Sequence, residues 1–257
     1  MTRIQELVSY VDELLATEET PDYPTALNGL HLENRAELKG IASAVDFSTR
    51  AINGAIEVGA NLLIVHHGMF WSGVDQLRGP SYRRLQLLLE HDIAVYSSHL
   101  PLDRHPTLGN NVLLAKELDL EPTGTFAKYD TTFIGVSGNT DVETSTLAQK
   151  AKKFASAYAG EVRVTPMPQG RRTRRWAICT GAGASSDTLK EAARTNIDTL
   201  IVGEGPHHTA IQAEENNLAI IYAGHYATET LGVRALANHL GDKYGIPATF
   251  VNAPTGL

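Results

Sequence analysis

Histidines and a carboxylate stand where predicted strands end in the first half of the chain. His66 and His67 are adjacent and follow the apolar run "LLIV", while His99 ends the apolar run "IAVYSSH". Asp103 stands four residues after His99. Imidazole nitrogens and carboxylate oxygens without thiolates suit zinc, iron or manganese. These residue types therefore point to a transition-metal site.

The second half of the chain repeats this arrangement. His225 follows the apolar run "LAIIYAG", and Glu229 stands four residues further on. A helix starting near Tyr226 would place His225 and Glu229 on one face, and the two oxygens of Glu229 could bridge two ions. Adjacent histidines point to opposite faces of a strand, but the backbone turn at its end lets them address two neighbouring points. Such a pair of ions, about 3.5–4 Å apart, would clamp both sides of a displacement reaction. The predicted metal ligands are His66, His67, Asp103, His225 and Glu229.

Other histidines have competing interpretations. His99, the counterpart of His225, could be a ligand or could orient one. The stretch "GEGPHH" offers Glu204, His207 and His208 as proton-transfer groups, or as polar residues at a helix start, where Glu and Pro are favoured in any case. A lone histidine is usually a polar residue at a surface turn, and we apply that interpretation to His31, His91, His105 and His239.

An alternation of strands and helices must position these groups. Apolar residues at helical spacing predict a first helix over 4–15. Strands and helices then alternate: strands at 40–48, 61–67 and 93–99, and helices at 49–59, 81–92 and 109–120. This order predicts βαβ units with largely parallel or mixed sheets. Functional groups in such sheets lie at the carboxyl ends of the strands, where these histidines stand.

A change of texture near residue 121 predicts two lobes, residues 1–125 and 126–257. The Thr- and Gly-rich segment there includes a short predicted strand at 132–136, followed by a helix at 144–160 and a strand at 161–168. The stretches from "STRAINGAIEVG" and from "SDTLKEAARTN" share one order of helix, strand, helix, strand ending in histidine, and closing helix. We interpret this echo as an approximate duplication of one α/β lobe, which gives the polar strand ends a place to converge.

Composition excludes several classes of protein. A net charge of −7 over 257 residues argues against nucleic-acid binding through a broad positive field. The cluster Arg171, Arg172, Arg174 and Arg175 is predicted to be a solvated hairpin tip, with an anion site as the alternative.

The single cysteine, Cys179, excludes a disulfide framework and a thiolate-rich zinc site, and should pack as a small apolar residue on a strand. "GAGAS" after it should form a tight turn. Neither a signal peptide nor a membrane span is recognisable, so we expect a cytoplasmic protein.

Seven motifs together resemble the YbgI-like family of dinuclear-metal proteins, often labelled GTP cyclohydrolase I type 2 homologues. In chain order they are "NGL" at Asn28, "VDFST" around Asp46, "LLIVHHGMFW", "YSSHLPLD", "GNN", "VGEGPHH" and "AGHYATETLG". Two positions depart from the family pattern. Gly68 stands where many relatives have proline, and Leu100 stands where threonine is common. Neither departure removes a candidate ligand.

The resemblance implies the same five metal ligands, with Glu229 bridging two divalent transition-metal ions (zinc, iron or manganese). It also implies two α/β lobes with the site between them, and a ring-shaped homohexamer with metal sites facing its interior. The chain is of the compact form, without an inserted middle domain.

We expect a metal-dependent hydrolase of a small phosphorylated or nucleotide-like substrate, with His99, Glu204, His207 or His208 moving protons. The alternative is a non-enzymatic metal-binding, metal-sensing or ring-scaffold protein. Five ligands shared by two ions leave open coordination positions, which favours the enzyme.

Overall fold

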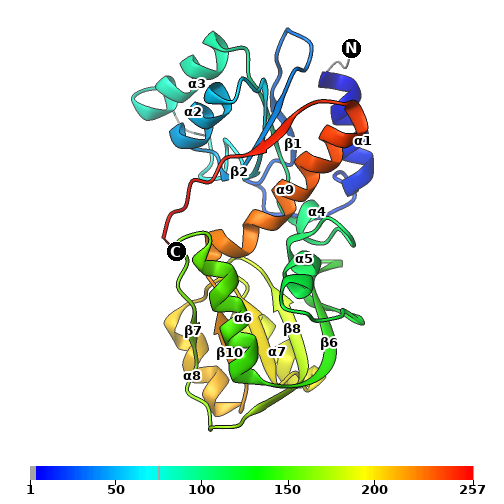
Figure 1. Ribbon diagram of the computed structural model, residues 1–257, viewed down its shortest axis with the longest axis vertical. Helices are drawn as coiled ribbons and strands as arrows, with labels where there is room; N and C mark the ends of the chain where they lie inside the picture. Colours follow the sequence, from blue (N-terminus) through cyan, green and yellow to red (C-terminus); the bar gives the residue numbers. More distant parts are fainter. Residues whose placement is uncertain (1–3, 75, 257) are drawn as a thin grey trace. The chain divides into compact units, whose positions relative to one another are not determined.

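The computed structural model describes residues 4–74 and 76–256, and contacts divide the chain into two units (Figure 1). Unit 1 comprises the N-terminal part of the chain as far as Leu102 and the segment Gly232–Ala253. Unit 2 comprises Asp103–Leu231 and the C-terminal segment from Pro254. Each unit has its own sheet.

The sheet of unit 1 is almost entirely parallel. Its strand order is β1-β4-β3-β2-β11, in which β1 alone runs antiparallel to its neighbour β4. The inner strands are continuous runs of buried residues, as expected for a sheet that is covered on both faces. The strands are β1 (Gly29–Leu32), β2 (Ile41–Asp46), β3 (Leu62–His67), β4 (Ala94–Ser97) and β11 (Ala248–Phe250).

Helices cover both faces of this sheet. On one face, α2 (Thr49–Glu57) and α3 (Pro80–Glu90) bury Ile52 and Leu88 against Leu63, Val65 and Val95. The Ser48 side chain caps α2 by accepting a hydrogen bond from the Ala51 amide. On the other face, Tyr96 donates its hydroxyl hydrogen to Asp12 of α1 (Ile4–Leu15) at 2.7 Å.

The sheet of unit 2 has the order β5-β6-β8-β9-β10-β7. Its centre, β8-β9-β10, is parallel, whereas β5, β6 and β7 each run antiparallel to the strands they join. The strands are β5 (Gly124–Tyr129), β6 (Thr132–Glu143), β7 (Arg163–Val164), β8 (Arg172–Cys179), β9 (Thr199–Val202) and β10 (Ala219–Tyr222).

Helices also sandwich the second sheet. The helices α5 (Asn110–Glu117) and α6 (Thr144–Ser156) share one core with Trp176, Ile178 and Ile201. The helices α7 (Ser186–Thr195) and α8 (His207–Glu215) share the opposite core with Leu200 and Ile220. The short helix α4 (Leu100–Asp103) lies at the division between the units, and α9 (His225–Tyr244) starts in unit 2 and ends in unit 1.

The α/β class with two separate sheets was predicted correctly, and the predicted strands and helices of the first half are present. Three strands, β1, β5 and β11, were not predicted. The strand expected at 132–136 is the first part of the longer β6, which pairs with both β5 and β8.

The arginine cluster was wrongly placed in a hairpin tip. Arg172, Arg174 and Arg175 lie on β8, and the turn before it is formed by residues 169–170. The side chains of Arg172 and Arg174 lie on Asp141 of β6, because β8 pairs with β6 and carries them out on its exposed face. Cys179 is buried on β8 as predicted, and the glycines after it lie in the connection 180–185 to α7, which bends at residues 181–182.

The contact-based division also differs from a single boundary at residue 125. The segment 103–125 belongs to unit 2 because α5 packs against β6 and β8. Residues 232–253 belong to unit 1 because β11 pairs with β2.

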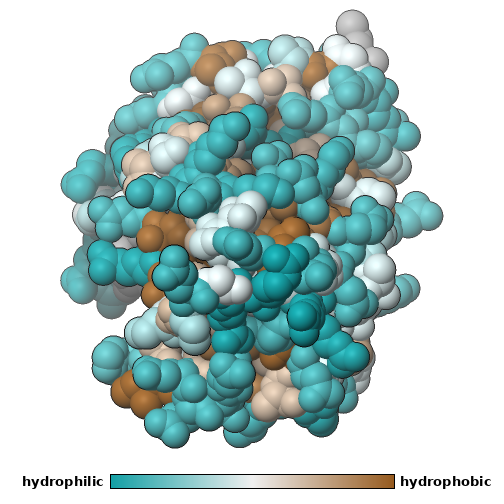
Figure 2. Space-filling model, turned by 60° about the horizontal axis from the view of Figure 1, so that its bottom comes forward, coloured by the Kyte–Doolittle hydropathy of each residue, from teal (hydrophilic) through white to brown (hydrophobic). Residues whose placement is uncertain are grey.

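Hydrophilic side chains cover most of the surface visible in Figure 2, and the hydrophobic areas on that face are small and scattered. Among the described residues, no helix has both the length and the apolar character needed to cross a membrane.

Candidate metal centre

Three histidines of unit 1 gather at the carboxyl ends of β3 and β4. His66 and His67 are the last two residues of β3, and His99 follows β4. Their ring centroids lie 4.8 Å apart for His66 and His99 and 4.9 Å apart for His66 and His67. One ring nitrogen from each histidine lies within 4.8 Å of the other two, close enough to hold one metal ion. His66 and His67 thus contribute to one cluster although they are adjacent residues of β3.

An acceptor fixes the Nδ1 atom of each of these rings. His66 Nδ1 lies 2.9 Å from the Ser98 carbonyl oxygen, His67 Nδ1 lies 2.8 Å from Asp46 Oδ1, and His99 Nδ1 lies 2.8 Å from Asp22 Oδ1. A carbonyl or carboxylate oxygen requires the hydrogen on Nδ1, so Nε2 carries the lone pair in the neutral ring. This is the arrangement in which histidines bind metals while an acceptor behind them holds their orientation.

Asp22 and the backbone also hold the His99 segment in place. The second oxygen of Asp22 accepts hydrogen bonds from the Leu100 amide at 2.9 Å and from Asn28 at 2.8 Å, and Asn28 in turn accepts from the His99 amide. Burial alone would raise the pKa of Asp22, but the hydrogen bond and charge of His99, with the other two donors, hold it below its ordinary value. Asp22 is therefore ionised at neutral pH.

Two aromatic side chains border the histidine cluster. The ring of Trp71 lies 4.5 Å from His67 and 4.6 Å from His99 between centroids, and Tyr23 lies 5.8 Å from His99. Such rings exclude water from one side of the imidazoles and restrict their rotation.

In unit 2, a histidine lies between two carboxylates. His225, the first residue of α9, has Nδ1 at 2.8 Å from Glu204 Oε1 and Nε2 at 3.1 Å from Glu229 Oε2. Glu204 follows β9, while Glu229 is one helical turn after His225, as the spacing of four residues predicted. Glu229 is only 3% exposed.

A glycine leaves the space that Glu229 occupies. Gly181 follows β8 in the left-handed conformation (φ +61°), and a Cβ atom there would collide with Glu229 Oε1. The Gly181 amide donates a hydrogen bond to the Thr228 hydroxyl at 3.1 Å, which ties the strand end to the first turn of α9. The end of β8 is therefore shaped around a buried carboxylate.

Asp103, the remaining predicted ligand, is 7% exposed and lies at the end of α4. The "GNN" motif holds it: Asn110 donates to Asp103 Oδ1 at 2.8 Å, and Asn111 donates to the Asp103 carbonyl at 3.3 Å. The side-chain oxygen of Asn111 accepts from the Thr180 amide, so Asp103 is linked to the end of β8.

Buried negative charge is concentrated here. Burial raises the pKa of the Cys179 thiol, and the charges of Asp103 and Glu229 raise it further. Burial alone would lower the pKa of His225, but Glu229 and Glu204 outweigh it and raise the pKa to about 9. Without a metal, the imidazolium of His225 offsets the carboxylates.

The remaining tentative residues are dispersed. His207 and His208 are exposed at the start of α8, consistent with the helix-start interpretation, and His207 lines a cavity described below. His105 accepts amide hydrogen bonds in a turn and His91 ends α3, as expected for surface residues. The turn interpretation was wrong for His31, which lies in β1, and for His239, which lies in α9 and pairs with the Tyr10 hydroxyl at 2.6 Å.

The carboxylates that orient His99 and His67 were not predicted as functional residues. Asp22 was not singled out, and Asp46 appeared only within a family motif. Asp46 at a strand end, in register beside His67, is the signal that could have identified it.

The donor chemistry fits divalent transition metals. Imidazole nitrogens with their orientation fixed and buried carboxylate oxygens are ligands for zinc, iron and manganese. The space kept at Gly181 for the Glu229 carboxylate supports the same conclusion.

Comparisons with known proteins agree with these features. A model of the Duf34/NIF3 (NGG1p interacting factor 3) family matches residues 2–255. The "GTP cyclohydrolase 1 type 2 homolog" of Pyrococcus horikoshii is 40% identical over 252 residues, 98% of this chain and 98% of that protein. The protein of the same name from Deinococcus radiodurans is 37% identical over 254 residues, 98% of this chain and 94% of that protein.

A solved structure, described as protein ybgI of unknown function, is 32% identical and covers all of both chains with a TM-score of 0.88. The resemblance recognised in the motifs is thereby confirmed. The matched length, the identities and the shared fold show that this chain belongs to the Duf34/NIF3 family.

Proposed function

We propose that the protein binds two divalent transition-metal ions and hydrolyses a small phosphorylated or nucleotide-like substrate. The ions are held by ligands from both clusters: His66, His67, Asp103, His225 and Glu229. The observation that carries this proposal is that His66, His67 and His225 each have Nδ1 fixed by an acceptor, and that unit 2 buries the carboxylates of Asp103 and Glu229. Burying ionised carboxylates is costly unless a cation compensates them.

Bound ions would supply Lewis acidity for polarising a phosphoryl or carbonyl oxygen. The chain's own residues orient the ligands and exclude water. Asp46 and Glu204 hold His67 and His225, while Trp71 covers the His67 ring. We assign His99, held by Asp22, the role of accepting or donating a proton at Nε2 or of a further ligand, which its place beside His66 and His67 supports.

The names of the relatives support a nucleotide-like substrate, since they are called homologues of GTP cyclohydrolase 1 type 2. We propose the hexameric ring as the assembly on the resemblance alone, and light scattering of the purified protein tests it.

Elemental analysis of untagged protein tests the metal centre. We expect about two ions per chain in the parent, and loss of both ions in His67→Ala of unit 1 and in Glu229→Ala of unit 2. If the two clusters formed separate centres, each variant would lose only one ion. The matched control is His91→Ala, which removes an exposed histidine outside both clusters and should retain both ions.

A screen of phosphoesters and nucleotides tests the reaction. Hydrolysis that requires added metal and disappears in Glu229→Ala supports the enzyme. A protein that holds two ions but turns over no member of the screen favours the non-enzymatic metal-binding alternative. A folded protein that cannot be loaded with zinc, iron or manganese contradicts both.

A further inference from the structure

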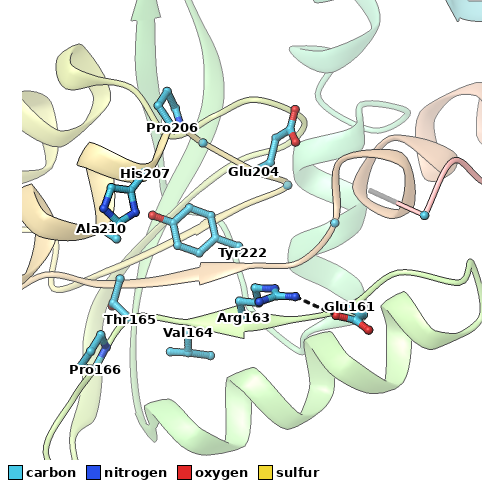
Figure 3. Close-up of a pocket in the computed structure, with 14 residues that line it drawn as sticks. Glu161, Arg163, Val164, Thr165, Pro166, Glu204, Pro206, His207, Ala210 and Tyr222 are labelled. Carbon is cyan, nitrogen blue, oxygen red and sulfur yellow. Dashed lines mark hydrogen bonds and ion pairs between the residues drawn. The ribbon is translucent and has the colours of Figure 1, made fainter.

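Unit 2 contains a cavity of about 450 Å³ beside the His225 cluster (Figure 3). Its walls come from β7 and the residues after it, the loop after β9, the first turn of α8 and the end of β10. Most of the lining is apolar or glycine, and Glu204, which holds His225, is part of it. A mainly apolar hollow with a few placed polar groups is typical of small-molecule sites.

Tyr222 provides the main flat surface of this cavity. It is the last residue of β10 and packs partly against the core shared with Ile220, while its ring is drawn at the centre of Figure 3. Its hydroxyl lies 3.0 Å from the Thr209 hydroxyl, and that threonine is fully buried and bonded to the Pro206 carbonyl. The ring is therefore held in place before any ligand binds, which lowers the entropic cost of stacking on it.

Arg163 stands directly across from Tyr222 on the neighbouring strand. The antiparallel register pairs Tyr222 with Arg163 and Ile221 with Val164. Residues directly opposite in such a pair project to the same face of the sheet. Both side chains therefore project from the same face of the sheet and line the same cavity, with the Arg163 guanidinium directed toward Glu161 (Figure 3).

The present partner of Arg163 is weakly held. Arg163 Nη2 lies 3.1 Å from Glu161 Oε2, and both side chains are about four-fifths exposed at 80% and 78%. Such exposed pairs contribute little because water screens them. A ligand anion can therefore replace Glu161 at the guanidinium at low cost.

We propose that this cavity binds a small planar aromatic ring that carries an anionic group, with the ring stacked on Tyr222 and the anion at Arg163. The ring lies between the Tyr222 phenol and the His207–Pro206 side, and Ala210 adds to the apolar wall. Glu204 and Gly224 place the inner end of the cavity next to His225. This inference rests on the proposed function, because it takes the compound bound in the cavity to be the substrate of the metal centre.

Calorimetric titrations with three probes separate the two contacts. Adenosine 5′-monophosphate has both ring and phosphate, adenosine has the ring alone, and ribose 5-phosphate has the phosphate alone. Tyr222→Leu should weaken binding of the two ring-containing probes about tenfold, as expected for loss of base stacking. Arg163→Gln should weaken the nucleotide several-fold and leave adenosine unchanged.

Conservative and matched variants guard against a folding defect. Tyr222→Phe keeps the ring and loses only the Thr209 hydrogen bond, so it should retain adenosine binding. Tyr158→Leu and Arg194→Gln change a tyrosine and an exposed arginine elsewhere in unit 2 and should bind all probes like the parent. Equal binding of the nucleotide by the parent and by Tyr222→Leu would overturn the proposal, as would the absence of saturable binding at millimolar concentration.

Metal content separates failure of this inference from failure of the proposed function. Tyr222→Leu should keep the parent's metal content, because the hydrogen bond of Tyr222 is to Thr209, which is not a proposed ligand. Ring binding that depends on Tyr222 in a protein without bound metal or hydrolysis would support the cavity and contradict the proposed function. Two bound ions and hydrolysis with unchanged kinetics in Tyr222→Leu would support the function and contradict the cavity.

Discussion

The two units build the same strand framework and use it to present different donors. In unit 1, the order β1-β4-β3-β2 begins with an antiparallel edge strand followed by three parallel strands. In unit 2, the order β7-β10-β9-β8 has the same directions. The echo recognised in the sequence is thus an echo of topology.

The strand pairing gives the correspondence residue by residue. Leu63 of β3 pairs with Ala42 and Val95, and Leu200 of β9 pairs with Ala177 and Ile220. Each leucine is fully buried in the middle strand of its parallel trio. These positions define equivalent registers in the two units.

Four residues after these paired positions, the side chains of the two units differ in chemistry. The middle strand leads to His67 in unit 1 and to Glu204 in unit 2, and the preceding strand leads to Asp46 in unit 1 and to Gly181 in unit 2. Unit 1 therefore presents an imidazole held by a neighbouring carboxylate. Unit 2 presents the carboxylate of Glu204 at this position, and Glu204 holds the imidazole of His225 at the start of α9.

The lesson is that the framework specifies where donors lie but not which donors they are. In unit 2, Gly181 leaves room for the Glu229 carboxylate, whereas Asp46 stands at the equivalent register of unit 1. Four predictions test this division between shared framework and separate chemistry.

Truncating equivalent core leucines should lower the free energy of unfolding by similar amounts in the two units. Leu63→Ala and Leu200→Ala each leave a cavity in a fully buried middle strand, and each should lower the free energy of unfolding by about 2–5 kcal/mol. Urea denaturation measures this. A large loss in one unit and none in the other would break the equivalence.

The strand end after β8 should be more sensitive than an ordinary left-handed glycine. Gly181→Ala has the cost of the left-handed conformation and a collision with Glu229, together about 2–4 kcal/mol. The matched control is Gly59→Ala, where φ is +68° and no atom lies within 4 Å of the added Cβ, so only about 1–2 kcal/mol is expected. Metal content should fall in Gly181→Ala alone, and equal metal content in the two variants would contradict the role of Gly181.

The acceptors behind the histidines should be equivalent in function. Asp46→Asn in unit 1 and Glu204→Gln in unit 2 keep side-chain size but weaken the hold on His67 and His225. Each should weaken metal affinity about 10–100-fold, as measured by competition with a chelator. Unchanged affinity in Glu204→Gln would show that only unit 1 needs an orienting carboxylate.

A smaller effect is expected where a carboxylate accepts from backbone amides. Asp92 accepts from the amides of Arg35 and Ala36 in unit 1, and Asp198 accepts from those of Arg174 and Arg175 in unit 2. Replacing either with alanine should cost about 1 kcal/mol at pH 7, because partial solvent exposure reduces the value of these bonds.

The loss of stability in Asp92→Ala should depend on pH. The hydrogen bond from the Arg35 amide holds the pKa of Asp92 below its ordinary value of 3.8. A lowered pKa stabilises the folded chain above the ordinary pKa, and this contribution disappears as the pH falls through the lowered pKa. Parent and Asp92→Ala should therefore differ at pH 7 and converge in stability as the pH falls below this lowered pKa, and a difference that persists throughout the acid range would contradict this.

Local patterns predicted much of the fold. The continuous apolar runs that became β2, β3 and β4 are recognisable because both faces of those strands are buried. The strands β1 and β5 escaped prediction because several of their residues are polar or exposed, and pairing with β4 and β6 holds them extended. The arginines of β8 were misplaced for the same reason, since a strand with exposed arginines resembles a loop until its partner β6 is known.

The sequence by itself determined the candidate donors, because strand ends, histidines and carboxylates at a spacing of four are local features. Only the tertiary structure decided which acceptor holds which ring. Asp22 lies 77 positions before His99, and Glu204 lies 21 before His225, separations at which no periodicity links two residues. Parallel strands joined by helices bring such distant residues to one edge of a sheet, and there the hydrogen bonds of the folded chain assign each imidazole its orientation.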